Sequence, residues 1–322
     1  SSAASDVYKR QIVTSTEEKI TKEGAKKSRQ VNKGDLILSN SMSYGLPYIM
    51  GIDGYIHDGW FVLKNFENTF DKDYLCNLLI SSAIQNQYKR LAAGGVVQNI
   101  SSDLVNSVSV SIPTMMEQKK ISSLLNLIDE RIATQNKIID KLQSLIKGIA
   151  QKIVRSNKPN VRLYECVECS SSTQQESEVC EQGAYPVYGA NGIVGYLDDY
   201  NTEGEAVYII KDGSGVGTVS YVTGKCSATG TLNTLQAKDG YSLQYLYYLL
   251  KVFNFEPYKT GMAIPHIYFK DYGKAKVFCP SYTEQLQYAR LLSAIDSKLS
   301  VEKNTLRNLS LQKQYLLRQM FI

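Results

Sequence analysis

The sequence predicts an α/β (α+β) protein built as an internal repeat, in which two α/β units are each followed by a long helix. Two observations predict this plan. A heptad seam of apolar residues appears twice, and the same order of strand, turn and helix signals precedes each seam. The copies are offset by 167 residues along the seams and by about 170 residues in the preceding units.

The first seam runs through Glu117–Val154, where apolar residues recur in alternating steps of four and three, the spacing of a coiled-coil helix. Its predicted interface residues are Ile121, Leu125, Ile128, Ile132, Ile139, Leu142, Ile146, Ile149 and Ile153. The second seam contributes Leu292, Ile295, Leu299, Leu306, Leu309, Leu316 and Met320. Both seams carry a polar residue at the same step, Gln135 and Glu302. Each helix is therefore the natural partner of the other.

One residue breaks the match between the seams, because Lys313 stands where the first copy has Ile146. We expect its ammonium group to reach to the helix edge near the end of the chain. The starts of the two helices agree more closely. Thr114 and Ser281 each lie three residues before a glutamate, which is the spacing of a capping box.

Short apolar runs bounded by glycine predict strands in the first unit at Lys33–Leu38 and Trp60–Leu63. Asp71 is placed to cap a helix that runs from Tyr74 to about Leu91. The alternation of valine and serine predicts a further strand at Val105–Ile112.

The second unit repeats this order. Asn157–Asn160 ends the first long helix, and glycines punctuate a turn between strands in Tyr185–Gly195. Ala206–Ile210 matches the strand at Lys33–Leu38, and Ser242 is placed to cap a helix that reaches Leu250.

The charge of the chain is unevenly distributed. Of 322 residues with a net charge of +5, the region Met115–Lys158 carries +5 and Tyr282–Ile322 carries +3, so the remainder carries −3. These lysines are either the solvated faces of helices or a basic spine that lies along a polyanion, and the sequence favours neither interpretation. The outer face of the first helix carries Lys119, Lys120, Lys137, Lys141 and Lys147.

No apolar run reaches the roughly 20 residues that cross a bilayer, so we expect a cytoplasmic chain with no membrane partner. Six cysteines include one CxxC pair, Cys166 and Cys169, with Cys180 further on. A zinc site needs four ligands, and the second pair is missing. We therefore favour reduced thiols and no metal.

Catalytic motifs are missing from the sequence. Gly213–Gly217 fails the dinucleotide pattern because Thr218 stands where a glycine is needed, and no Walker, nucleophile-elbow or zincin motif occurs. His266, beside Pro265, is better read as a loop residue than as a catalytic base. We predict no catalytic residue, no cofactor and no enzymatic activity.

Four kinds of segment carry a resemblance to a known family. They are Val31–Ser39, Ile210–Gly217, Tyr188–Gly192 and the Pro-x3-Glu-Gln lead into each helix, at Pro113 and Pro280. In their order and duplication they resemble the specificity (S) subunit of a type I restriction-modification system. The resemblance implies two target recognition domains, each of which binds one half of a bipartite double-stranded DNA target. It also implies an antiparallel coiled coil that spaces these domains, two docked methyltransferase (M) subunits and restriction (R) subunits that act in host defence.

The predicted boundaries follow this plan: a disordered or foreign leader at 1–11, recognition domain 1 at 12–113, long helix 1 at 114–158, recognition domain 2 at 159–280 and long helix 2 at 281–322. At an offset of 170 the first copy would begin about nine residues before Ser1. We therefore expect recognition domain 1 to be incomplete at its N-terminus.

The length of the seam suits the implied role. A helix rises about 1.5 Å per residue, so a 33-residue seam is about 48 Å long, whereas one turn of DNA is about 34 Å. Such a spacer fits two half-sites about one turn apart. Two helices of equal length also offer equivalent positions to two identical M subunits.

Residue type and position on loops predict the DNA contacts. In the first unit they are Asn40, Ser43, Tyr44, Lys89, Arg90, Gln98 and Asn99. In the second unit they are Asn191, Lys211, Ser214, Lys225, Lys259, Thr260 and His266. Three alternatives stay open: the specificity subunit of a type IIB-like enzyme, a coiled-coil scaffold without DNA binding, and a stand-alone methyltransferase or nuclease.

Overall fold

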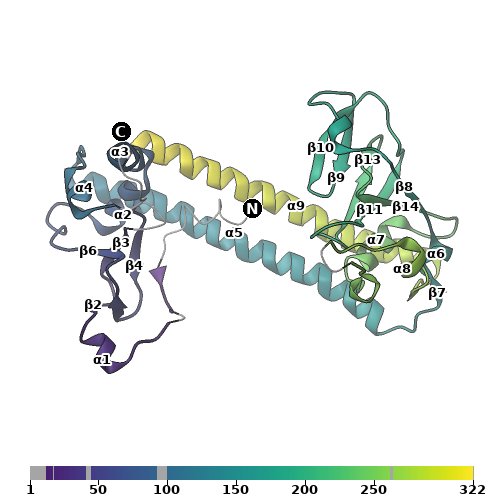
Figure 1. Ribbon diagram of the computed structural model, residues 1–322, viewed down its shortest axis with the longest axis horizontal. Helices are drawn as coiled ribbons and strands as arrows, with labels where there is room; N and C mark the ends of the chain where they lie inside the picture. The colour runs from purple at the N-terminus through teal and green to yellow at the C-terminus, as the bar shows by residue number, and fades with distance from the viewer. Residues whose placement is uncertain (1–11, 17, 41–44, 93–99, 262–263, 322) are drawn as a thin grey trace. The chain divides into compact units, whose positions relative to one another are not determined.

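The computed structural model describes residues 12–16, 18–40, 45–92, 100–261 and 264–321 (Figure 1). The chain divides into two compact units. Unit 1 comprises Ser1–Lys137 with Lys303–Ile322, and unit 2 comprises Ile138–Glu302. Each unit therefore combines one globular part with a portion of both long helices, which are α5 (Met115–Arg155) and α9 (Tyr282–Met320).

Unit 1 contains a four-stranded sheet in the order β1-β4-β3-β6 and a two-stranded sheet of β2 and β5. Its strands are β1 (Ile12–Val13), β2 (Arg29–Val31), β3 (Leu36–Ser39), β4 (Pro47–Met50), β5 (Gly54–Ile56) and β6 (Trp60–Leu63). Its shorter helices are α1 (Lys22–Ala25), α2 (Lys72–Ile80), α3 (Ser82–Ala92) and α4 (Ser102–Ser107). β3 pairs antiparallel with both β4 and β6. The strands expected at 33–38 and 60–63 are thus present as β3 and β6.

Two expectations for unit 1 were wrong. The single helix expected from Tyr74 to Leu91 is broken at Ser81, whose ψ of 153° is extended and ends α2. The Ser81 hydroxyl then accepts the amide proton of Ile84, so it helps to start α3. The strand expected at 105–112 begins as helix α4, because the Ser101 hydroxyl accepts the amide proton of Leu104 at 3.2 Å. Local capping therefore overrode the valine–serine alternation.

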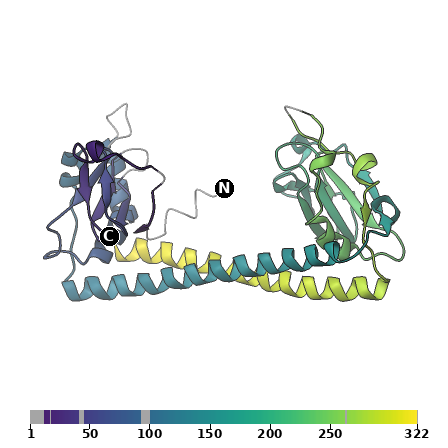
Figure 2. The ribbon, with the colours of Figure 1, turned by 90° about the horizontal axis from the view of Figure 1, so that it is seen from below.

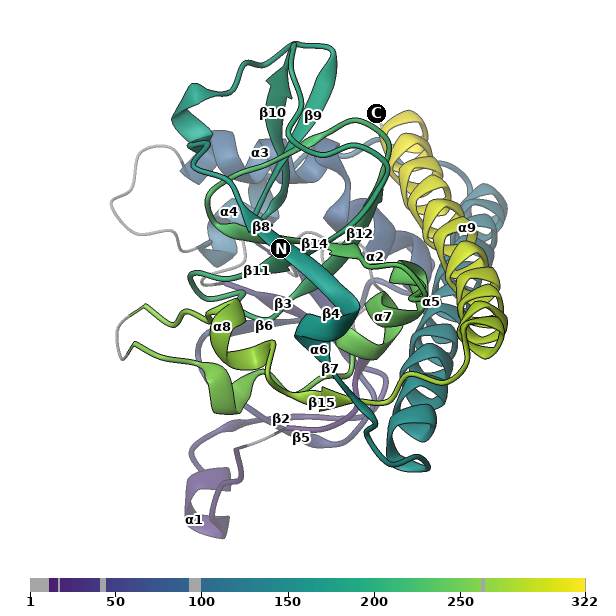
Figure 3. The ribbon, with the colours of Figure 1, turned by 90° about the vertical axis from the view of Figure 1, so that its right-hand side faces the viewer.

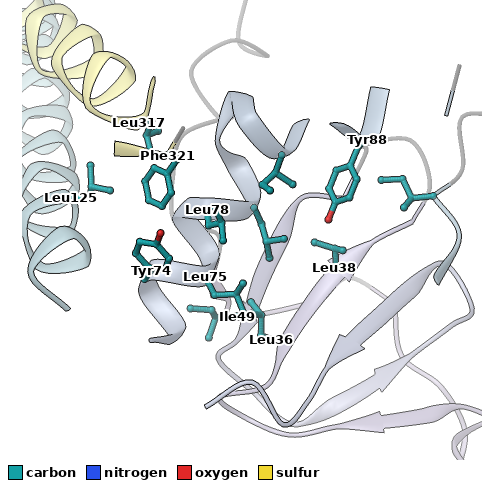
Figure 4. Close-up of a cluster of buried hydrophobic side chains, with 13 residues drawn as sticks. Leu36, Leu38, Ile49, Tyr74, Leu75, Leu78, Tyr88, Leu125, Leu317 and Phe321 are labelled. Carbon is teal, nitrogen blue, oxygen red and sulfur yellow. The ribbon is translucent and has the colours of Figure 1, made fainter. Parts of the chain in front are cut away.

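The core of unit 1 lies between its sheet and its helices (Figure 4). Leu36 and Leu38 of β3 are alternate residues, so they point to the same face of the sheet and meet α2. Tyr74 of α2 carries the cluster onward to Leu125 of α5 and Phe321 beyond α9, and the rings of Tyr74 and Phe321 lie 5.1 Å apart. The two long helices are therefore part of this core.

Unit 2 has a four-stranded sheet in the order β12-β11-β14-β8, a three-stranded sheet in the order β10-β9-β13, and the pair β15-β7. Its strands are β7 (Val161–Arg162), β8 (Val167–Ser171), β9 (Tyr185–Gly189), β10 (Gly192–Leu197), β11 (Glu205–Ile210), β12 (Val219–Thr223), β13 (Ser227–Ala228), β14 (Leu232–Ala237) and β15 (Lys276–Val277). Its shorter helices are α6 (Leu163–Cys166), η1 (Glu176–Glu178), α7 (Leu243–Leu250), η2 (Glu256–Tyr258) and α8 (Phe269–Tyr272).

β11 is the central strand of unit 2 and is buried from Ala206 to Ile210. Ala206, Tyr208 and Ile210 face the β9 sheet, and α7 packs beside β11 and β12. The expected cap of α7 is present, since the Ser242 hydroxyl accepts the amide proton of Tyr245 at 3.3 Å. With both faces covered, β11 sets the rigid position from which the following loop departs.

The long helices pair antiparallel within the units. In unit 1 the Asp129 carboxylate meets Lys313, and one to two turns earlier on α5 Leu125 shares a cluster with Leu317 and Phe321, which lie after Lys313. In unit 2 the two helices lie side by side in all three ribbon views (Figures 1 to 3). Every residue of the two predicted seams is buried or half-buried. Among the described residues no helix is long and apolar enough to cross a membrane.

The expectation for Lys313 was wrong. Its side chain is 1% exposed and does not reach to the helix edge. Its Nζ lies 2.6 Å from Oδ1 of Asp129, whose side chain is 20% exposed. A buried ammonium needs such a partner, because an unpaired charge in the interior is very costly. The seam thus contains an internal ion pair where the pattern suggested an interruption.

A glutamine at the start of each long helix ties that helix to its unit. Gln118 Oε1 accepts the amide proton of Asp71 at 2.8 Å, and Gln285 Oε1 accepts that of Ser242 at 2.9 Å. Asp71 and Ser242 are the N-caps of α2 and α7. Glu117 completes the expected capping box with Thr114, and the Glu284 carboxylate accepts from the amide and the hydroxyl of Ser281. In the Pro-x3-Glu-Gln motif, the glutamate therefore stabilises the start of the long helix and the glutamine anchors it to the unit.

Candidate nucleic-acid interface

The loop that follows β11 is held by the segment that precedes α8. The amide of Ile267 donates to the Lys211 carbonyl, and the amide of Gly213 donates to the Pro265 carbonyl, each at 2.9 Å. Gly213 has a φ of +92°, a conformation that favours glycine, and the tight turn leaves Ser214 exposed. The position of Ser214 is therefore fixed by backbone hydrogen bonds to a segment about 50 residues away in the sequence.

Thr260 and His266 pair with each other at the two ends of the loop that connects them. Their amides and carbonyls exchange two hydrogen bonds of 2.9 Å, and the Thr260 hydroxyl also donates to the His266 carbonyl at 3.3 Å. Asp212 is bridged to His266 as well. The structure thus brings together four of the predicted contacts of unit 2, namely Lys211, Ser214, Thr260 and His266, which we call the unit 2 loop cluster. Lys259 adjoins this cluster, but its ammonium is paired with Glu256 at 2.6 Å.

Figure 3 shows the segment that leads into α8 on the side of unit 2 away from α5 and α9. The cluster therefore lies on a face that the long helices leave open. Sequence reasoning missed Tyr268, which is 46% exposed on this segment. Its ring lies 4.8 Å from that of His266, and the Lys270 ammonium lies 5.0 Å above it. Tyr268 lies two residues after His266 in an extended segment, where alternate side chains point to the same side. That spacing could have identified Tyr268 from the sequence.

Two predicted contacts of unit 2 stand apart from the loop cluster. Asn191 lies exposed in the turn between β9 and β10. Lys225 lies between β12 and β13, 3.8 Å from the Glu203 carboxylate and 4.6 Å from the ring centre of Tyr200. These neighbours raise the pKa of Lys225, with the hydrogen bond to Tyr200 as the larger cause. Lys225 is already engaged within the protein.

Unit 1 repeats the backbone frame of the loop cluster. The amide of Ile100 donates to the Asn40 carbonyl at 2.8 Å, as Ile267 does to Lys211. The Asn40 amide group donates to the Asp58 carbonyl at 2.9 Å, and its buried Oδ1 has no hydrogen-bond partner within the described ranges. Lys89 and Arg90 are exposed on the last turn of α3. The remaining predicted contacts, Ser43, Tyr44, Gln98 and Asn99, lie outside the described residues.

The predicted CxxC pair, Cys166 and Cys169, does not form a common site. Cys166 Sγ lies 3.8 Å from that of Cys279, and this contact lowers the pKa of Cys166. Cys169 lies elsewhere, and burial raises the pKa of its thiol to about 11. Within the part of the chain that the structure describes, no group of three or more His, Cys, Asp and Glu side chains could hold a metal ion.

The two units share a backbone hydrogen bond at Asn40 and Lys211, and they place different side chains on that frame. Over residues 4–144 and 160–310 the sequence matches the family described as the type I restriction modification DNA specificity domain. The chain belongs to this family, and the family model matches it twice.

Known relatives agree with this assignment. The chain is 27% identical over 117 residues to the type I restriction enzyme EcoprrI specificity subunit of Escherichia coli, a match that covers 36% of this chain and 29% of the relative. It is 26% identical over 261 residues to a putative type I specificity subunit of Mycoplasma genitalium, with 74% of this chain and 68% of the relative covered. The chain therefore matches less than a third of the first relative's length and about two thirds of the second's.

Solved structures show the same fold. The type I restriction-modification S subunit from M. genitalium superposes with a TM-score of 0.66 at 19% identity, covering 91% of this chain and 84% of that one. A second chain, from a study of complex assembly and conformational transition of the type I system, gives a TM-score of 0.58 at 16% identity, covering 90% and 82%. The α/β fold with an internal repeat and paired helices is thereby confirmed.

Proposed function

We propose that this chain is the non-catalytic DNA-specificity subunit of a type I restriction-modification complex. In this proposal each unit binds one half of a bipartite double-stranded DNA target. The observation that carries it is the duplicated loop frame. Equivalent hydrogen bonds to Asn40 and Lys211 hold two different side chains at matching places, and different side chains at one frame are what two different half-sites require.

The chemistry of the unit 2 loop cluster suits DNA. Lys211, Ser214, Thr260 and His266 offer donors and acceptors to phosphates and base edges, and the backbone bonds between the two loops preorganise them. Exposed Tyr268 adds a flat ring that can stack or contact a thymine methyl group. Long charged side chains without such support would lose more conformational entropy on binding.

We further propose that the long helices space the two readers and dock two methyltransferase subunits, with restriction subunits joining the complex. Leu124 and Leu291 support this docking. They occupy equivalent positions, 167 residues apart, and are 41% and 50% exposed. Exposed leucines at matched positions are suited to two copies of one partner. The predicted domain boundaries belong to the same proposal.

Methylome sequencing tests this function. DNA modified by the chain with its methyltransferase partner should carry a split motif with a fixed gap. His266→Ala together with Lys211→Ala should degrade only the half of the motif read by unit 2, because each lost base or phosphate contact costs about 1–3 kcal/mol. Lys274→Ala together with Lys276→Ala is the matched control, since both lysines are exposed in unit 2 and neither is a predicted contact. Methylation that is indifferent to sequence would refute the proposal.

A further inference from the structure

Unit 1 carries a short segment that is rich in basic residues. Between residues 19 and 33 the sequence holds six basic residues and one acidic residue, a net charge of +5. The basic residues, which we call the basic arm, are Lys19, Lys22, Lys26, Lys27, Arg29 and Lys33. The whole chain also has a net charge of +5. The arm therefore concentrates as much net charge as the entire protein carries.

All six side chains of the basic arm are exposed. They lie on α1, on β2 and on the turns beside them. Within the described part of the chain the structure records no ion pair for any of them, although it does record one for the half-buried Lys259 of unit 2. Lysines gathered on one surface, with Glu23 as the one acidic residue in their segment, create a positive potential.

The counterpart in unit 2 has the opposite charge. At the offset of 170 that relates the two units, residues 189–203 correspond to residues 19–33. This segment contains Asp198, Asp199 and Glu203 and no lysine or arginine, a net charge of −3. Glu203 also contacts Lys225, so the acidic segment neutralises the basic residue nearest to it. The fold therefore does not require a basic arm at this position.

The basic arm lies on a side of unit 1 that the long helices do not cover. In Figures 2 and 3, α1 lies on the side of unit 1 away from α5 and α9. In unit 2 the face away from these helices is the one that carries the loop cluster. A basic surface on that face of unit 1 can thus contact DNA without competing for the helices.

We propose that the basic arm binds the phosphate backbone of duplex DNA beside the half-site of unit 1, and that unit 2 has no equivalent contact. This inference rests on the proposed function, because it takes duplex DNA as the partner. The arm adds affinity that does not depend on base sequence, since phosphates carry no sequence information. Unit 1 would then hold DNA by charge as well as by loops, whereas unit 2 relies on its loop cluster.

Salt dependence tests the basic arm. We would titrate the full chain into a labelled 30-base-pair duplex of arbitrary sequence and follow fluorescence anisotropy at several KCl concentrations. Each phosphate contact contributes about −0.9 to the slope of log K against log salt. The variant Lys22→Gln, Lys26→Gln, Lys27→Gln should therefore lose up to about 3 from the magnitude of this slope. Its affinity at low salt should fall by at least about tenfold.

Two variants separate charge from structure. Lys22→Arg, Lys26→Arg, Lys27→Arg keeps the charges and should keep the slope. The control Lys274→Gln, Lys276→Gln, Lys303→Gln removes three exposed lysines elsewhere and should leave the slope nearly unchanged. If the arm variant keeps the wild-type slope, or if the control loses as much, the arm has no special role. If the unaltered chain shows no salt-dependent binding to DNA, the proposed function itself fails, and the inference fails with it.

Discussion

The two long helices contact each other differently at one equivalent pair of positions in the two units. In unit 1 Lys313 is buried and paired with Asp129. The matching residues of unit 2, 167 positions away, are Ile146 and Asp296. Ile146 is buried without a charge, and Asp296 is left to accept a hydrogen bond of 3.4 Å from Tyr248 of α7. One aspartate is thus committed to the partner helix and the other to the globular part.

This difference teaches how the repeat has diverged. The apolar frame is kept, because a seam must bury its residues on both sides. A polar position can change only with its partner, since a buried charge without a counter-charge costs several kcal/mol. A substitution of Asp129 or Lys313 therefore requires a matching change of the other residue, whereas Ile146 and Asp296 can be substituted independently.

The largest expected effect comes from breaking the ion pair. Asp129→Ala removes the carboxylate that lies 2.6 Å from the buried Lys313 ammonium, and should destabilise unit 1 by about 3–5 kcal/mol. Asp296→Ala should cost about 1 kcal/mol or less, because only a long hydrogen bond to a half-buried side chain is lost. Chemical denaturation of the two variants measures the difference.

A double variant sharpens this test. Asp129→Ala with Lys313→Ile copies the uncharged arrangement of Ile146 and should recover most of the lost stability, since buried ion pairs are often replaceable by apolar residues. Equal losses for Asp129→Ala and Asp296→Ala would show that the two ends of the helices are alike after all.

The seam itself should respond equally in both units. Leu125 is 0% exposed and its counterpart Leu292 is 1% exposed. Leu125→Ala and Leu292→Ala should each cost about 2–5 kcal/mol, the range for a leucine removed from a packed core. Leu124→Ala, one residue away but 41% exposed, is the control and should cost far less. A large difference between Leu125→Ala and Leu292→Ala in thermal melting would mean that the two units use the helices differently.

The helices were predictable because their signal is long and periodic. Seam, capping box and N-cap depend on residue type at fixed spacing, and Thr114, Ser281, Asp71 and Ser242 all act as expected. The break at Ser81 was harder to foresee, since a serine is tolerated inside many helices and becomes a boundary only through its backbone angles. Short elements thus depend on local choices that periodicity does not report.

The sequence predicted where the candidate loops lie better than it predicted which of their side chains are available for binding. Lys211 and His266 come together only because the end of β11 meets the segment before α8, as in the hydrogen bond from the Ile267 amide to the Lys211 carbonyl. Lys225 was chosen for its charge, but Glu203 and Tyr200 already hold it. Residue type suggests what a side chain can bind, whereas tertiary packing decides whether it is available.

The glutamine anchors should give a smaller and nearly matched pair of effects. Gln118 and Gln285 are both almost fully buried, and each accepts the amide proton of an N-cap residue. Replacing either by alanine leaves that amide unsatisfied, which should cost about 1–3 kcal/mol. Gln118 also donates to the Thr69 carbonyl, a bond that Gln285 has no recorded equivalent for within the described residues, so Gln118→Ala should be the more harmful. Urea denaturation would reveal the order, and the reverse order would contradict this account.

The smallest effect concerns the capping box of α5. The hydroxyl and amide of Thr114 both donate to the Glu117 carboxylate, at 2.7 and 2.9 Å, and the hydroxyl bond is the main cause that holds the pKa of Glu117 below its ordinary value. Because the pKa is lower in the folded chain, this contact stabilises the fold above the unfolded pKa and is lost as pH falls through the folded one. Thr114→Val removes the hydroxyl and keeps the amide, so NMR titration should show the pKa of Glu117 returning part of the way to its ordinary value. Ser122→Ala, one turn further along α5, should leave that titration unchanged, and an unaltered pKa in Thr114→Val would show that the hydroxyl is not its cause.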